Sequence, residues 1–251
     1  MSSPLNYREF APWPSLAGSL DCFWASSISA ASRAPLVHRV LPDGCIDLLF
    51  DFTAAGDRRA TVIGTMTRAL AVTTSGLVDL LGVRFRPGGL SGLIRFNAAE
   101  LTDTRVDLGN FLGPQALELW HRLGEAAPAD RIPLLQESLA ARGRDTLQVD
   151  PFVRHCVSQI EAARGGLRVC EHAESTGLST RQVERKFARH IGVGPKAFAR
   201  IVRFKAVEQA AAAEGAKDWA RLAADLGFAD QSHLAREFRA FSGLTLTEFT
   251  S

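Results

Sequence analysis

The feature that most constrains the fold is a degenerate repeat in the second half of the chain. Ala173, followed by Gly177, recurs fifty positions later as Ala223, followed by Gly227. In each copy a short helical pattern ends at the glycine and a longer amphipathic pattern follows. The alanines let two helices approach closely, and the glycines permit the positive φ that ends the first helix. The repeat therefore predicts two helix-turn-helix units.

The second helix of the first unit is expected to have an apolar face and a basic face. Ser179 is suited to cap its N-terminus. Val183 and Phe187 are four residues apart, so both are expected to point inward. Three arginines recur every four residues on the other side: Arg181, Arg185 and Arg189.

The second helix of the second unit divides in the same way. Asp230 is suited to cap it, and its inner stripe consists of Leu234, Phe238 and Phe241. Gln231 and His233 are expected near its start, and Ser232, Arg236 and Arg239 on a face away from this stripe. The N-terminal end of a recognition helix is the part that reaches base edges in the major groove, and Arg, Gln and Ser can bind those edges.

The two units and the helix between them thus form an expected DNA-binding surface. Basic residues of the intervening helix, Lys205 among them, are expected to contact phosphates. A single pattern of this kind is more often ordinary helix packing, but two matching copies favour DNA binding. Arg185 and Arg236 retain an alternative role as salt-bridge partners within their units. The candidate DNA-binding residues are Thr180, Arg181, Glu184, Arg185, Arg189, Lys196, Arg200, Arg203, Gln231, Ser232, His233, Arg236 and Arg239.

The distribution of charge agrees with this assignment, although the net charge of +2 says little. Residues 149–251 carry a formal charge of +3, whereas residues 1–148 carry −1. The segment from Arg181 to Lys205 holds eight basic residues and one acidic residue, Glu184. Such a segment can neutralise phosphates, and a solvated helix face is the alternative explanation.

A domain boundary is expected close to residue 149. Asp150 suits an N-cap, and Pro151 suits the first helical position. The DNA-binding domain is therefore placed at 149–251, with helix-turn-helix units at about 168–191 and 218–242 and a linker helix at about 195–213. The helices are expected near 151–164, 168–175, 179–191, 195–213, 218–226, 231–242 and 245–250.

Residues 1–148 are expected to form a β-rich domain with helices at its C-terminal end. Turn signals occur at 42–44 and 86–89. Short strands at this spacing are typical of a sandwich or barrel. From about residue 96 to 142 the period is helical, most clearly near 114–124 and 130–142. The strands are expected near 37–41, 45–52, 60–64, 69–73 and 80–85.

Three roles compete for this first domain: small-molecule sensing, dimerisation through the helices near 114–142, and catalysis. A small barrel can hold one ligand, and buried polar groups need partners. Arg84 and Arg86 have the alternative of pairing with Asp43 or Asp47, and Cys45 can be a reactive thiol or a small core residue. The candidate ligand-binding residues are His38, Asp43, Cys45, Arg84 and Arg86.

An enzyme is not expected, and no metal or cofactor is expected either. The six histidines show no H-x-H pair, and no G-x-S-x-G, P-loop or H-E-x-x-H motif occurs. The four cysteines form no C-x-x-C pair, which disfavours a disulfide framework. No apolar stretch is long enough to span a bilayer, and the first residues do not look like a secretory signal. A cytoplasmic location without membrane contact is therefore expected.

Two stretches of the helical half resemble a known family. Residues 223–245 contain AADLGF, followed by the spaced residues Ser232, Leu234, Arg236, Phe238 and Gly243, and resemble the C-terminal signature of AraC/XylS-type transcription regulators. Residues 178–200 resemble the first helix-turn-helix unit and linker helix of the same domain. The resemblance covers roughly 152–250. Leu246 stands where the family usually has proline, so we expect a local change in the final helix rather than lost binding.

Residues 8–110 resemble, less strongly, an N-terminal domain attached to such regulators. Segments 39–48 and 82–89 carry this resemblance. It implies an α+β multidomain protein, with a cupin-like β-barrel or sandwich that senses a small molecule or mediates dimerisation. The expected function is a bacterial, sequence-specific DNA-binding transcription regulator under effector control. The alternative is a ligand-binding or protein-interaction module that has lost specific DNA binding.

Double-stranded DNA is the expected partner. RNA polymerase, a small-molecule effector and a second copy of the chain are further candidates. The sequence leaves open the effector, the operator, activation versus repression, the oligomeric state, and whether both units contact bases.

Overall fold

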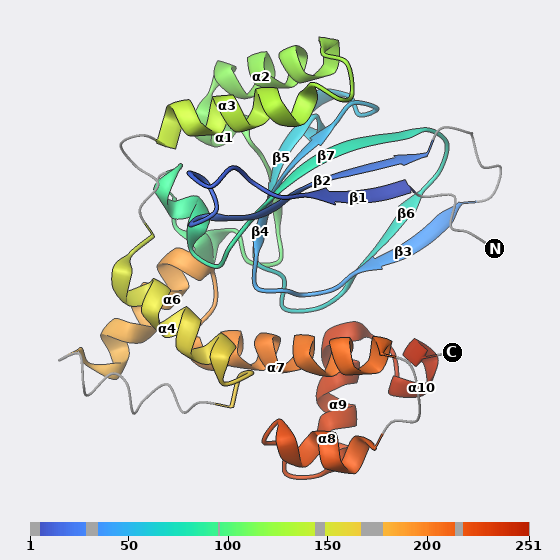
Figure 1. Ribbon diagram of the computed structural model, residues 1–251, viewed down its shortest axis with the longest axis vertical. Helices are drawn as coiled ribbons and strands as arrows, with labels where there is room; N and C mark the ends of the chain where they lie inside the picture. The colour runs from blue at the N-terminus through green and yellow to red at the C-terminus, as the bar shows by residue number, and fades with distance from the viewer. Residues whose placement is uncertain are drawn as a thin grey trace.

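The computed structural model describes residues 6–28, 35–94, 96–143, 149–166, 178–213 and 218–250. Its N-terminal part is built on β-sheets, and its C-terminal part is helical (Figure 1). The described strands are β1 (Asn6–Phe10), β2 (Leu20–Ile28), β3 (Leu36–Val40), β4 (Ile46–Asp51), β5 (Ala60–Ile63), β6 (Leu70–Thr74), β7 (Val78–Phe85) and β8 (Arg105–Asp107).

The strands form two separate antiparallel sheets. Six of them lie in the order β1-β2-β7-β4-β5-β8, and β3 pairs with β6 in a two-stranded sheet. The expected strands near 37–85 are all present. The sequence did not predict β1, β2 or β8. All five residues of β1 are exposed at a sheet edge, and β8 has only three residues, so neither carries an alternating apolar pattern.

One face of the six-stranded sheet carries the N-terminal core. Phe23, Val83 and Leu48 are neighbours across β2, β7 and β4, and each is at most 1% exposed. Leu123 and Leu135 pack into the same core from two helices that cover this face (Figure 1). The helices of this part are α1 (Gly109–Leu112), α2 (Pro114–Glu125) and α3 (Arg131–Gly143).

Two expectations for the N-terminal part need correction. The described strands do not close into a barrel, because β1 and β8 remain unpaired edges of the six-stranded sheet. Helices also do not begin near residue 96. A short 3₁₀ turn at Ala98–Glu100 is followed by β8, which pairs with β5, and α1 starts only at Gly109. The pairing with β5 decides the conformation of 105–107, and the local sequence pattern does not report such a contact.

The C-terminal helices agree with the sequence prediction. They are α4 (Pro151–Ala162), α6 (Thr180–Ile191), α7 (Pro195–Ala212), α8 (Trp219–Asp225), α9 (Gln231–Ser242) and α10 (Leu246–Thr250). Together they form a second core, with Phe187, Phe198, Phe238 and others buried. The helix expected near 168–175, with Ala173 and Gly177, lies outside the described residues. No helix among those described is long and apolar enough to cross a membrane.

The two parts of the protein are in direct contact. Gly44, in the turn between β3 and β4, lies against α7: a Cβ built on it would be 2.7 Å from Cε2 of Phe198. Leu41 of the same turn packs against the C-terminal core. Figure 1 shows α7 running beside the two-stranded sheet, on the side of the molecule away from α2 and α3.

Asp150 stabilises the start of the helical part in two ways. Its Oδ1 accepts hydrogen bonds from the N–H groups of Phe152 and Val153, as expected of an N-cap. Its Oδ2 accepts a 2.6 Å hydrogen bond from Lys186 Nζ on α6, which the sequence did not predict. Burial by itself raises the pKa of Asp150, but the Lys186 ammonium and the Val153 N–H outweigh it, so the pKa lies below its ordinary value.

We expect Asp150→Ala to lower the free energy of unfolding by about 1–2 kcal/mol, because it removes both the cap and the ion pair. Asp150→Asn is the matched control: its side-chain oxygen preserves the cap, so it should lose less. A carboxyl group whose pKa is lower in the folded than in the unfolded state stabilises the fold at pH values above its unfolded-state pKa. This stabilisation is lost as the pH falls through the folded-state pKa. The difference between wild type and Asp150→Asn should therefore vanish in acid. A difference that stays constant in urea titrations from neutral to acidic pH would contradict the ion pair.

Candidate nucleic-acid interface

The first candidate recognition helix, α6, begins with a full capping box. Ser179 accepts from the Gln182 N–H, and the Gln182 side chain in turn accepts from the Ser179 N–H at 2.8 Å. Val183 and Phe187 are buried, as predicted. The opposite face is exposed to solvent and carries Thr180, Arg181, Glu184, Arg185 and Arg189.

The second candidate recognition helix, α9, is capped by Asp230, whose Oδ1 accepts from the His233 N–H at 2.6 Å. The predicted inner stripe is buried in the C-terminal core. His233 is only half-exposed: its Nδ1 accepts from the Ala229 N–H at 3.3 Å, and its ring packs edge-on against Phe228. The exposed candidates on this helix are Gln231, Ser232, Arg236 and Arg239.

The alternative structural role of the two central arginines has no support within the described part of the chain. There, neither Arg185 nor Arg236 forms an ion pair, and both are exposed. Arg185 and Arg189 instead line an open cleft of about 420 Å³ opposite Phe96, Asn97 and Ala99 of the N-terminal part. Both arginines therefore border an open cleft.

The basic residues of α7 differ in their availability. Lys196 is exposed. Arg200 Nε is hydrogen-bonded to Glu237 Oε1 of α9, and its guanidinium lies 5.3 Å from the Phe241 ring centre. Arg203 donates to the Gly227 carbonyl at 3.3 Å and lies over Phe228. Arg200 and Arg203 therefore hold the second unit on α7, and a phosphate would have to compete with these contacts.

Lys186 shows why the basic segment 181–205 overstates the charge available to DNA. Its ammonium is bound to Asp150, as described above, and it also lies near the Phe152 ring. Nearby, His190 is within 4.0 Å of the same carboxylate. Burial lowers the pKa of His190, which keeps the imidazole neutral near pH 7.

Gly227 ends α8 with the predicted positive φ of 71°. No heavy atom lies within 4 Å of a Cβ built on it, so only backbone conformation restricts this position. We expect Gly227→Val to lower the free energy of unfolding by about 1–2 kcal/mol. Gly227→Asn, which tolerates positive φ, should lose distinctly less. Equal stabilities of the two variants in urea denaturation would show that the turn does not require this conformation.

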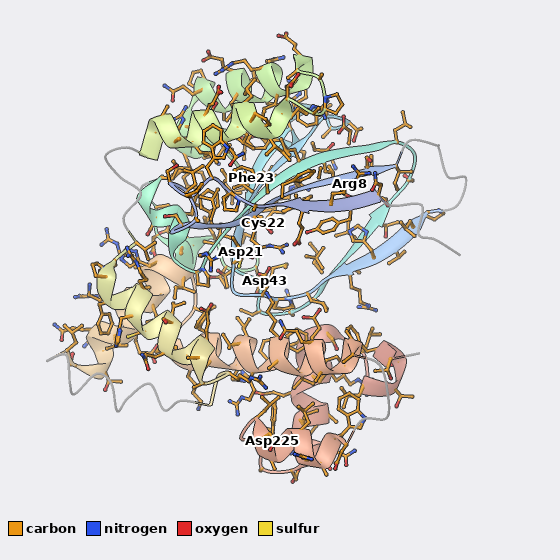
Figure 2. All side chains as sticks on the ribbon, in the orientation of Figure 1. Arg8, Asp21, Cys22, Phe23, Asp43 and Asp225 are labelled. Atoms are coloured by element: carbon orange, nitrogen blue, oxygen red, sulfur yellow. The ribbon has the colours of Figure 1, made fainter. Side chains whose placement is uncertain are left out.

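The N-terminal part contains a second candidate site, a polar cluster on the sheet face opposite the core. Arg84 on β7 is its centre: Nε lies 3.2 Å from Asp43 Oδ2 and 3.5 Å from Asp47 Oδ1, and Nη1 lies 3.7 Å from Glu9 Oε1. The predicted alternative of pairing with Asp43 or Asp47 is thus what Arg84 does. Asp43, labelled in Figure 2, lies between the sheet and the C-terminal helices.

Burial strongly perturbs the ionisable groups of this cluster. It raises the pKa of Asp47 to about 7, with Arg84 opposing and Asp43 adding to the rise. Burial lowers the pKa of Arg84, but the carboxylates of Asp47 and Asp43 outweigh it and raise the pKa overall, so the guanidinium stays charged. Burial and these same carboxylates raise the pKa of the Cys45 thiol well above its usual value. This disfavours the thiolate and hence the reactive role of Cys45.

The remaining predicted ligand residues lie apart from Arg84. His38 is on β3 of the two-stranded sheet, and its Nδ1 is buried without a hydrogen-bond partner among the described residues. The predicted alternative that Arg86 pairs with Asp43 or Asp47 is wrong. Arg86 follows the end of β7, where it donates to the carbonyls of Ala17 and Leu20 and lies 3.7 Å from Asp21.

Three members of the cluster were not predicted from the sequence: Asp47 as a ligand candidate, Trp24, and Glu9. Asp47 is the direct cross-strand neighbour of Arg84 in the pairing of β4 with β7. Trp24 covers Gly82 on the same face, and its indole N–H partly opposes the rise in the pKa of Asp47. The alternating pattern of β4, in which Asp47 lies between Ile46 and Leu48, was a signal that could have placed Asp47 on this face.

Comparison with protein families identifies two segments. Residues 8–107 match a family described as a domain of unknown function (DUF6597). Residues 172–251 match a family described as a helix-turn-helix domain, which is of the AraC type. No curated protein matches the chain.

Among solved structures, the chain is similar to ToxT from Vibrio cholerae. A crystal structure of ToxT from strain O395 has 9% sequence identity and a TM-score of 0.45, with 91% of this chain and 96% of that chain covered. The unsaturated fatty acid bound wild-type ToxT from strain SCE256 has 9% identity and a TM-score of 0.39, with coverages of 98% and 94%.

Proposed function

We propose that this protein, whose residues 172–251 carry a helix-turn-helix domain of the AraC type, is a sequence-specific DNA-binding transcription regulator. The observation that carries the proposal is the form of α6 and α9. Each is capped at its N-terminus, buried along one apolar face and exposed along a polar face, whose arginines form no ion pair with any described residue. Such a helix end is suited to enter the major groove.

The length of α7 supports contact with two groove segments by one chain. Its 18 residues, at about 1.5 Å each, span about 27 Å. Successive major-groove faces on one side of B-DNA lie about 34 Å apart, a separation that two units can reach once their own width is added. We propose that α6 and α9 contact adjacent segments of a site that need not be palindromic, with Lys196 on a phosphate.

We also propose that the N-terminal part controls this activity in response to a small molecule. The Arg84 cluster is the candidate site, because it brings the buried charges of Arg84, Asp43 and Asp47 together on one face of the sheet. The turn that carries Asp43 continues to Gly44, which packs against Phe198 of α7. A conformational change at the cluster would therefore reach the linker helix α7 through the contact of Gly44 with Phe198.

The test is a footprint of the full-length protein on a duplex selected from random DNA, made at two salt concentrations. We expect protection of about 15–20 bp in two groove segments, and a steep loss of affinity with salt. Protection of one segment only would mean that one unit does not contact DNA. The absence of any selected sequence would favour the alternative, an interaction module without specific DNA binding.

Two further partners belong to this proposal. A regulator acts in the cytoplasm beside RNA polymerase, and a second copy of the chain would double the protected region. Footprints at increasing protein concentration distinguish a monomer on one site from a homodimer on two.

A further inference from the structure

The loop that joins β5 to β6, residues 64–69, contacts the C-terminal ends of both candidate recognition helices. Thr65 is fully buried, and its hydroxyl donates a hydrogen bond to the carbonyl of Ile191, the last residue of α6. Four residues later, the Ala69 N–H donates to the carbonyl of Phe241 in the last turn of α9 at 2.7 Å. One short loop of the N-terminal part is thus bonded to both helices.

These hydrogen bonds satisfy groups that a helix leaves open, because the last four carbonyls of an α-helix have no partner within it. Thr102 adds another: its hydroxyl donates to the Gly192 carbonyl, directly after α6, at 2.6 Å. All three contacts are at the helix ends opposite to those that we propose enter the major groove. The loop can therefore hold both helices without obstructing their contact with bases.

The loop is itself anchored to the turn before β8. The N–H and hydroxyl of Thr67 donate to the two carboxylate oxygens of Asp103 at 2.7 and 2.5 Å. The Asp103 N–H donates back to the Thr65 carbonyl at 3.0 Å. A loop fixed in this way transmits its position to the helices that it binds.

The loop also connects the two sheets. It leaves the six-stranded sheet at β5, which pairs with the β4 strand that carries Asp47, and it enters the two-stranded sheet at β6, which pairs with the β3 strand that carries His38. A displacement of one sheet relative to the other therefore acts directly on residues 64–69.

We propose that the β5–β6 loop, residues 64–69, fixes the orientation of α6 and α9 relative to each other and so sets the spacing of DNA segments that the protein accepts. The proposal rests on the DNA-binding function proposed above and specifies how the N-terminal part regulates it. A ligand that shifts the two sheets would change the accepted spacing through this loop.

The experiment measures binding of the full-length protein to its selected site and to versions with one or two base pairs inserted between the protected segments. For the wild type we expect each insertion to weaken binding about tenfold or more, as a misread base pair does. Thr65→Val removes the hydroxyl with little change of shape. The penalty of an insertion, meaning the fold-loss of affinity that it causes, should be about threefold smaller than in the wild type. A factor of about three corresponds to one modest hydrogen bond. Thr65→Ser keeps the donor and should retain the wild-type penalties.

Thr67→Val removes the hydroxyl bond that anchors the same loop to Asp103. It is the second variant, in case Thr65→Val does not fold, and should reduce the penalties in the same direction. Folded Thr65→Val or Thr67→Val protein with wild-type penalties would overturn the proposal. A melting temperature that falls while the penalties stay unchanged would also overturn it, since that is the result of a purely structural bond. Failure of the proposed function is distinct: the wild type would then select no sequence at all.

Discussion

Arg185→Ala is expected to weaken specific DNA binding by about 1–3 kcal/mol, or about 5- to 150-fold, if Arg185 contacts a base edge. Arg185 lies on the exposed face of α6, beside an open cleft, and forms no ion pair with any residue that the structure describes. Its removal should therefore leave the melting curve unchanged. Binding to unrelated DNA should change little, because non-specific affinity depends on phosphate contacts.

The measurement is a competition gel shift with the selected site and with scrambled DNA. Arg221→Ala is the matched control: Arg221 is exposed on α8 and lies 3.9 Å from Asp225 one turn away, outside the candidate recognition helices. It should bind like the wild type. An equal loss on both DNAs would make Arg185 a phosphate contact, and loss of folding would make it a structural residue.

Phe198→Ala is expected to lower the free energy of unfolding by about 3–5 kcal/mol, as for other fully buried phenylalanines. Phe198 on α7 is 0% exposed and packs against Phe187 of α6 with ring centres 6.2 Å apart. It also touches Gly44 of the N-terminal part. The cavity left by its removal would therefore loosen the first unit, the linker helix and the contact between the two parts.

The loss in free energy of unfolding is measured by urea denaturation, with circular dichroism as the probe. Phe10→Ala is the matched control, because Phe10 lies on the edge strand β1 and is 38% exposed. The control should lose less than about 1 kcal/mol. Similar losses for both variants would show that burial on α7 does not determine the stability of the helical part.

The local features of the helical half were predictable because they depend on neighbours in the sequence. The caps at Ser179 and Asp230 and the positive φ of Gly227 are set within one or two helical turns. The buried stripes follow from the 3.6-residue period. The same kind of reasoning found β3 to β7, where turns and apolar runs are close together.

Other features depended on contacts between distant residues, which no local pattern reports. The exposed strand β1 and the short strand β8 exist because a neighbouring strand supplies their hydrogen bonds. Lys186 belongs to the basic segment 181–205, but its ammonium is bound by Asp150, 36 positions away in the sequence. Arg200 likewise turned out to bind Glu237 of the second unit.

The sequence by itself thus determined the second helix-turn-helix unit, the second helix of the first unit, and the caps and polar faces of α6 and α9. Only the tertiary structure decided which basic side chains remain free and how the N-terminal part reaches the recognition helices. The contact of Thr65 with Ile191 joins residues 126 positions apart. Such pairs depend on the packing of whole elements against one another, since a residue's own neighbours fix its conformation but not its distant partner.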